Sequence, residues 1–561
     1  MDPSKPSSPH PKIKPILVQR LSPGKNKNEK NLQKRSPTSA KEFTLTKACN
    51  LTKHFTKTLT SQQKPSKLEY ELHLHELQSL RQRFPTTITH FFSKIKTLQS
   101  LTIFNLQAHQ VILSKRNFYL KPLLMSLTSL KNLSNLSMMF FTTHTKDPEW
   151  LKIIFKYLKR IKTLKDLTVS FRNSRRNLST SYIDIFSSGL SKLRQLHSLE
   201  LLFCSLFTDS HYFINQLTLA LPKLHFLTKI DIRFNESSEV ADITPDLFLC
   251  FSKMKALSDI TLVLQSAWTN YVNDPISQGL SLLDHSRIRK LHLHPYHHFD
   301  SDCLVQLSRV LKNFTSLQTL QIVLTSHRLL EEEGPTALFS TLSSLVSLSS
   351  LTIILLLKYE DKEIVERISV LCKSLKNLVS LQLQFEGSAF FHEQGIQQLF
   401  SNIRLLKSVR FLTLNCPLPE INNQHLETLG ETLKELPQLQ NLSLDFSSTD
   451  LLTNDGFEAL TSGILTLKNL SGFTLRLQAN SKLDNKTVDH IIRILQNLEN
   501  LYSVDFCLGK CPQMTDFDGF FRALRRAGIG EVALTLPDEA MGSLEIIHLV
   551  ENKIMKRMAN V

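Results

Sequence analysis

The segment that determines the fold is residues 196–206, which read LHSLELLFCSL. Leu196 is followed by two variable residues, Leu199, one variable residue and Leu201. In an extended strand, Leu199, Leu201 and Phe203 point to the same side, because side chains alternate between the two faces. The segment therefore predicts a short strand with one buried face.

The same pattern of apolar residues recurs along most of the chain. Fifteen copies occur at intervals of about 31 residues, a regularity that marks a repeat architecture. The copies open at Leu98, Leu133, Leu164, Leu196, Leu227, Leu257, Ile288, Leu317, Leu348, Leu378, Val409, Leu439, Leu470, Leu501 and Ile529.

Between copies, the apolar residues switch to helical spacing. Leu304, Leu307, Leu311 and Phe314 are separated by three, four and three residues, which places them on one face of a helix. The same spacing precedes later copies, for example from Leu426. A strand and a helix that alternate in this way predict a parallel sheet covered by helices.

The repeat resembles that of the leucine-rich-repeat family. The opening segment matches the consensus L-x-x-L-x-L-x-x-[NC]-x-L throughout, and Leu227, Ile230, Ile232 and Asn235 match it through the Asn. The long helical half resembles the ribonuclease-inhibitor-like class. Over residues 98–536 the resemblance implies an α/β solenoid, a curved horseshoe with parallel strands on the concave face and helices on the convex face. It also implies a non-enzymatic scaffold that binds proteins.

The chain departs from this consensus at the turn after each strand. Only Cys204 and Asn235 keep the ninth consensus position, whose side chain ties down turn backbone groups in the family. We expect Phe side chains at the eighth position to replace part of that polar ladder by burial, at about 2 kcal/mol per ring. The turn groups then need other partners. The Phe residues are Phe140, Phe171, Phe203, Phe234, Phe385 and Phe446.

The net charge of +17 is unevenly distributed. Residues 1–67 hold fifteen Lys or Arg and three acidic residues, which leaves only +5 on the rest of the chain. The basic composition is therefore a property of the tail and is weak evidence for a nucleic-acid-binding fold. RNA or an anionic membrane surface would be bound, if at all, through this tail.

Composition and periodicity together divide the chain. Within the tail, Ser8, Ser22 and Ser36 each precede Pro, which makes them candidate phosphorylation sites. The alternative is a chance recurrence in a Ser/Pro-rich segment, and the basic run 25–35 also fits a nuclear import signal. The predicted divisions are a disordered basic Ser/Pro/Lys-rich tail (1–66), an N-terminal cap or degenerate repeat (67–97), the solenoid (98–536) and a C-terminal capping helix (537–561).

Compartment is predicted from cysteines and hydropathy. Eight Cys occur without a C-x-x-C pair, which favours a reducing compartment, the cytoplasm or alternatively the nucleus. The N-terminus lacks the apolar core of a secretory signal. Residues 338–357 carry no charge and are long enough to cross a bilayer, but they fit the repeat register, so we expect them to belong to the solenoid.

The working surface of a solenoid is usually its concave face, which the second, third, fifth and seventh residues of each copy would line. Charged residues gather there in the third to seventh copies. A mixed-charge band on a neutral face suits recognition of a protein partner, and a solvated surface without a partner is the equal alternative. This concave band comprises Lys165, Asp166, His197, Glu200, Lys229, Asp231, Arg233, Arg289, Lys290, His292 and His294.

Signals for chemistry are weak. His292, His294, His297 and His298 are ligand types that suit zinc or copper, but no Cys or carboxylate completes a known spacing, so a polar loop is favoured. Catalytic and phosphate-binding motifs do not occur. We therefore expect a monomer without cofactor, metal or enzymatic activity.

A regulator of catalysis is the alternative function. An adaptor of a ubiquitin ligase would need a helical docking segment before the repeats, and residues 68–97 are too short for one. A GTPase activator would need an exposed arginine in a turn after a strand. Arg172, Arg175 and Arg176 form the only such cluster.

Overall fold

The computed structural model describes part of the compact unit Gln62–Val561. The predicted tail, N-terminal cap and C-terminal helix lie outside the described residues, apart from residue 537. The described ranges are 100–107, 120–141, 148–172, 180–203, 210–235, 244–265, 275–295, 300–326, 331–357, 363–386 and 393–537.

Each of the fifteen sequence copies forms a strand, as predicted. The strands pair in parallel and in chain order within one sheet, so each repeat contacts its sequence neighbours. The strands are β1 (Ser100–Gln107), β2 (Asn135–Phe141), β3 (Asp166–Arg172), β4 (Ser198–Phe203), β5 (Lys229–Asn235), β6 (Asp259–Gln265), β7 (Lys290–Pro295), β8 (Thr319–Ser326), β9 (Ser350–Leu357), β10 (Ser380–Glu386), β11 (Phe411–Asn415), β12 (Asn441–Asp445), β13 (Gly472–Arg476), β14 (Ser503–Cys507) and β15 (Glu531–Thr535).

One α-helix lies between each pair of consecutive strands, from α4 between β1 and β2 to α17 between β14 and β15. The helices are α4 (Leu120–Thr128), α5 (Glu149–Leu158), α6 (Thr180–Leu190), α7 (Ser210–Ala220) with the 3-10 turn η2 (Leu221–Lys223), α8 (Thr244–Ser252), α9 (Pro275–Ser281), α10 (Ser301–Leu311), α11 (Glu333–Ser344), α12 (Ile364–Ser374), α13 (Glu393–Ile403), α14 (Asn423–Lys434), α15 (Asn454–Ile464), α16 (Asn485–Asn497) and α17 (Asp518–Arg526).

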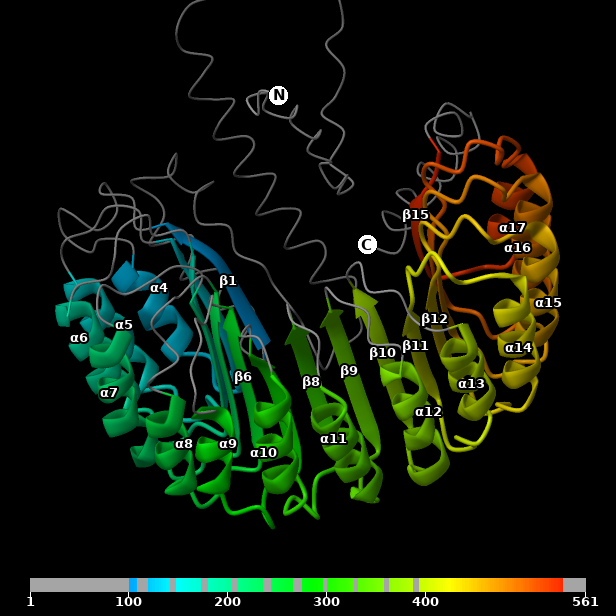
Figure 1. The fold of residues 1–561 in the computed structure, drawn as a ribbon. Helices are drawn as coiled ribbons and strands as arrows, with labels where there is room; N and C mark the ends of the chain where they lie inside the picture. Colours follow the sequence, from blue (N-terminus) through cyan, green and yellow to red (C-terminus); the bar gives the residue numbers. More distant parts are fainter. Residues whose placement is uncertain are drawn as a thin grey trace, which may run out of the picture. The chain divides into compact units, whose positions relative to one another are not determined.

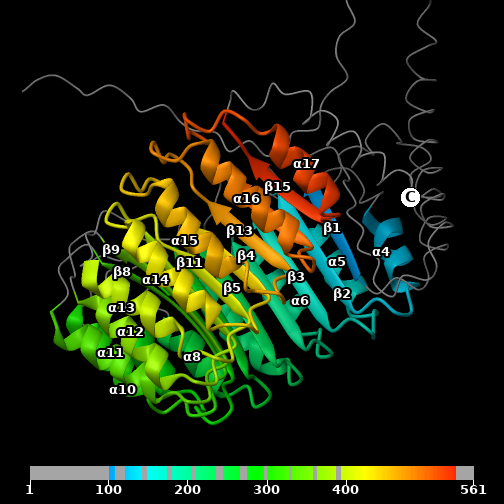
Figure 2. The same ribbon diagram turned by 90° about the vertical axis from the view of Figure 1, so that its right-hand side faces the viewer.

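The described repeats form a curved α/β solenoid. Strands line the inner side of the arc and helices cover its outer side, and the sheet does not close, with β1 and β15 at its two ends (Figure 1). Seen from the side, helices and strands keep to separate layers (Figure 2). This is the arrangement that the alternation of strand and helix periods predicts.

Leucine layers run from strand to strand and form the core. Leu442 of β12 is in register with Leu412 of β11 and Phe473 of β13. All three side chains are at most 1% exposed, whereas Ser443 faces the other side and is half-buried. The parallel register therefore stacks equivalent apolar positions, which makes the core continuous along the solenoid.

The predicted phenylalanine positions are buried. Phe140, Phe171, Phe203 and Phe234 form a column with ring centroids 5.4, 5.7 and 5.3 Å apart. The rings of Phe171 and Phe203 are nearly parallel, at 5°. Contiguous stacking of this kind adds to the stabilisation from area burial alone.

Asparagines at other positions hold several turns. The Asn480 amide donates to the carbonyl oxygens of Phe446 and Leu477, and its oxygen accepts from Thr449. A second set, at the helix starts, was not predicted, although its interval of 31 residues is visible in the sequence. In that set the side-chain oxygens of Asn423 and Asn485 accept backbone N–H groups of the next repeat, and that of Asn454 accepts the Thr487 hydroxyl.

The uncharged segment 338–357 spans the end of α11, a turn and β9, as its repeat register predicts. Among the described residues, no helix is long and apolar enough to cross a bilayer.

Candidate functional site

The concave band lies on the side of the sheet opposite the helices. Its members fall in β3, β4, β5 and β7 or in the residue before one of these strands. Alternation decides their direction: Leu199 and Leu201 are fully buried in the core, while Glu200 between them is half-buried on the other face. The band members in each strand that share the parity of Glu200 therefore lie on the face opposite the leucine core.

Two hydrogen-bonded pairs, one within β5 and one between β3 and β4, occupy the middle of the band. The Arg233 guanidinium donates two hydrogen bonds to the Asp231 carboxylate, at 2.9 and 2.8 Å. On the neighbouring strands, the Thr168 hydroxyl donates to Glu200 at 2.9 Å. The bond to Asp231 is the main cause of a raised pKa of Arg233, and the charge of Glu200 adds to it. The two pairs restrict these side chains before any partner binds.

Asp231 is more deeply placed than its surface position predicts. It is only 4% exposed, although it lies on the concave side. Its bidentate pairing with Arg233 satisfies the buried carboxylate, which otherwise would be costly to desolvate. Reversal of the charge at Arg233 would leave the buried Asp231 carboxylate unpaired and should therefore destabilise the fold.

A second ion pair joins β6 and β7. Lys290 Nζ lies 3.6 Å from Asp259, which also accepts a hydrogen bond from the Ser258 hydroxyl at 2.9 Å. Sequence reasoning missed Asp259, although it is the third residue of its copy and the rule for concave positions includes it. Arg476 of β13 and Asp505 of β14 form another overlooked pair, at 3.4 Å.

His292 and His294 lie half-buried on β7. Burial, with the nearby Arg233 charge, lowers the pKa of His292 to about 4 and lowers that of His294 as well. Both rings are therefore neutral at pH 7. The described residues contain no cluster of three metal-ligating side chains, and His297 and His298 lie outside them.

Several of the described cysteines are poor nucleophiles. Burial raises the pKa of both Cys250 and Cys372 to about 12. Since the thiolate is the reactive form, these groups are inert at neutral pH.

Several predicted positions lie outside the described residues. Arg172 ends β3, and Arg175 and Arg176 of the predicted activator cluster follow outside them. The candidate phosphorylation sites Ser8, Ser22 and Ser36, and the consensus residue Cys204, also lie outside them.

Comparisons with known proteins add little to this picture. No family model matches the sequence, and no curated protein matches it. Among solved structures, the chain is similar to two structures of the Toll–Spätzle complex, a molecular hub in Drosophila development and innate immunity. One of the two is the glycosylated form. The TM-score is 0.32 for both, with 14% and 12% identity over 80% of this chain. The chain spans about half (53%) the length of those chains.

Proposed function

We propose that this protein is a non-enzymatic scaffold that binds a protein partner with its concave band. The observation that supports the proposal is a set of two hydrogen-bonded pairs on neighbouring strands, Thr168 with Glu200 and Arg233 with Asp231, which orient polar groups on the sheet. Side chains that are ordered before binding lose little entropy when a partner docks.

The charge pattern favours a protein over a uniform polyanion at this face. Positive and negative side chains alternate across β3 to β7, for example Glu200, Lys229 and Asp259 on three successive strands. Five strands about 4.8 Å apart make a patch about 20 Å wide, the scale of a modest protein interface. Mixed charges of this kind select a partner with the complementary pattern.

Reversal of one exposed cation tests the proposal. Arg289 precedes β7 and Arg410 precedes β11, and each is the exposed second residue of its copy. The carbonyl oxygen of each arginine accepts hydrogen bonds from two backbone N–H groups of the next repeat, so the two positions are equivalent. Arg289→Glu should weaken binding of the partner about tenfold, because it changes the charge of the band. Arg410→Glu, outside the band, should not.

The measurement has two stages. Proteins captured by the wild-type chain are compared with those captured by each variant, and the affinity of a purified candidate is then measured by calorimetry. A partner that is lost equally with both variants, or only with Arg410→Glu, would rule out the concave band as its binding site.

We also propose a monomeric protein in the cytoplasm, with the nucleus as the alternative. The support for the compartment is that Cys250, Cys372, Cys416, Cys507 and Cys511 are thiols, since oxidising compartments favour paired cysteines. Fluorescence imaging of the tagged chain and light scattering of the purified protein test these two points.

A further inference from the structure

The turns that lead from a helix into the next strand carry a concentration of positive charge in the early repeats. The five turns before β2, β3, β4, β5 and β6 contain no Asp or Glu between the helix end and the strand start. Their cations are all exposed. They are Lys131, Lys159, Arg160, Lys162, Lys165, Lys192, Arg194, Lys223, Lys253 and Lys255, called here the basic edge.

The basic edge is an ordered column. Lys131, Lys162, Arg194 and Lys255 each lie two residues before the opening Leu of their copy, and His225 occupies the same position between Arg194 and Lys255. Since equivalent positions of stacked repeats lie side by side, these side chains follow one another along the solenoid at roughly the strand spacing of 4.8 Å. A column of this kind matches a ligand with a repeating negative charge.

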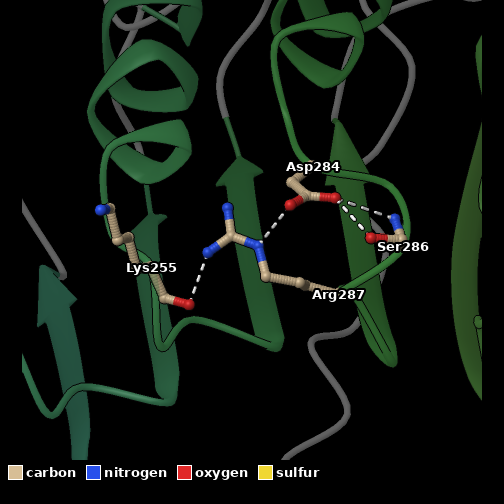
Figure 3. A network of polar contacts seen from close by, with 4 residues as sticks. All are labelled: Lys255, Asp284, Ser286 and Arg287. Carbon is tan, nitrogen blue, oxygen red and sulfur yellow. Dashed lines mark hydrogen bonds and ion pairs between the residues drawn. The ribbon is translucent and has the colours of Figure 1, made fainter.

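Nothing among the described side chains neutralises the edge. None of its cations forms an ion pair with a described carboxylate. The next turn, before β7, differs: Arg287 donates to Asp284 at 2.7 Å and to the carbonyl oxygen of Lys255 (Figure 3). Hydrogen bonds from Ser286 and Arg287 lower the pKa of Asp284, so its charge persists and ends the uncompensated column.

Helix stability alone does not explain the edge. Cations next to a helix C-terminus offset the helix dipole, but the effect fades within the last turn. Lys159, Lys192 and Lys253 are close enough to act in this way, whereas Lys162 and Lys255 lie further along the turn. Moreover, the turns at 345–349 and 498–502 follow helices of similar length and contain no Lys or Arg.

An exposed aromatic ring lies beside the cations. Phe226, in the turn before β5, is 61% exposed and packs almost parallel to His197, with ring centroids 6.1 Å apart. A shallow groove between the turns is lined by Lys159, Arg160, Lys162, Lys192, Arg194 and Phe226. Flat exposed rings next to a positively charged groove are the features that hold unpaired bases and their phosphates.

We propose that the basic edge binds single-stranded nucleic acid, with phosphates along the cation column and a base stacked on Phe226. A membrane surface is flat and would leave the groove empty, and an acidic peptide would leave the ring without a planar partner. The site borders the concave band, since Lys165 belongs to both and Phe226 packs on His197, and it goes beyond the scaffold function. The repeat region has a net charge near zero, but its positive charge is concentrated at the basic edge, which would allow it to bind a polyanion there.

The test is a salt titration with the full-length chain. The edge variant combines Lys162→Glu, Arg194→Glu and Lys255→Glu. The control variant makes the same change of charge at exposed cations in later turns on the same edge, namely Lys312→Glu, Lys376→Glu and Lys468→Glu. Binding of uridine and thymidine oligonucleotides of about 20 nucleotides is followed by fluorescence anisotropy between about 50 and 200 mM salt.

Three lost phosphate contacts should lower the slope of log K against log salt by about 2 and weaken binding roughly tenfold in the edge variant only. Loss with both oligonucleotides assigns the edge to the shared phosphodiester chemistry, and a larger loss with one identifies the preferred of the two polymers. Equal effects of edge and control variants would overturn the proposal, since the tail would then account for binding. Loss of binding to phosphatidylserine vesicles or polyglutamate, with the oligonucleotides unaffected, would overturn it too.

A second variant separates stacking from charge. Phe226→Ala should weaken oligonucleotide binding on the order of tenfold without a change of the salt slope. The control is Phe411→Ala, an exposed ring on β11 away from the edge. Because each of these substitutions is at an exposed side chain, circular dichroism melts should match the wild type, and an unchanged affinity for Phe226→Ala would exclude the stacking site.

Discussion

Among the described histidines, His292 has a pKa that burial lowers far below its ordinary value. Burial, the Arg233 charge and His294 lower its pKa from 6.5 to about 4, and only Asp231 opposes them. Because the folded pKa lies below the unfolded one, the folded state binds fewer protons between these values. Its contribution to stability is complete above pH 6.5 and declines as the pH falls toward 4.

His292→Gln should remove this dependence. The wild-type chain should lose up to about 3 kcal/mol of stability relative to the variant as the pH falls from 7 to 4. Thermal melts at several pH values measure the difference, with His225→Gln, at an exposed ring, as the control. Parallel profiles for wild type and His292→Gln would show that this ring does not titrate as described.

The face of the sheet on which each concave side chain lies was predictable from the sequence, whereas its degree of burial was not. A strand period of two leaves no choice once Leu199 and Leu201 are assigned to the core. Burial of Asp231 depends instead on how the long Arg233 side chain folds back onto it, which no local pattern encodes.

Between elements, helices α14 and α15 approach at backbone distance. A Cβ atom on Gly463 would lie 2.2 Å from the carbonyl oxygen of Gly430, and one on Gly430 would lie 2.5 Å from that of Ala459. Alanine is favoured over glycine in helices by about 1 kcal/mol, but this contact cannot relax without moving a helix. We therefore expect Gly463→Ala to lower the thermal midpoint by several degrees.

A glycine in another helix provides the control. In α17, a Cβ on Gly519 would meet only the end of the Ile492 side chain, at 3.0 Å, which can shift. Gly519→Ala should leave the midpoint unchanged or raise it slightly. If both substitutions stabilise the protein equally, the close packing of α14 and α15 is not as described.

Elements that repeat a consensus were predictable, and those outside it were not. The strands follow from the Leu spacing, whereas the asparagine set that begins with Asn423 and the basic edge use positions that the consensus leaves variable. The net charge of the repeats does not reveal the basic edge, because acidic residues elsewhere in the repeats offset its positive charge. Alignment of the copies on their opening Leu would have revealed Lys131, Lys162 and Arg194 in one column.

For the whole molecule, stability should reside in the stacked repeats. A solenoid is held together by contacts between neighbouring repeats, so a segment without the repeat pattern contributes little. Residues 1–66 lack periodic apolar residues, and we expect the chain 68–561 to melt at the same temperature as the full chain. Circular dichroism melts compare the two, and a drop of many degrees would mean that the tail caps the array.

The same truncation separates the two sources of positive charge. Removal of residues 1–67 takes away a net charge of +12 and should weaken oligonucleotide binding overall. If the basic edge binds nucleic acid, the difference in salt slope between the truncated wild type and its Lys162→Glu, Arg194→Glu, Lys255→Glu variant should persist at about 2, because the edge is part of the repeats. A difference that vanishes with the tail would mean that the edge only assists binding by the tail.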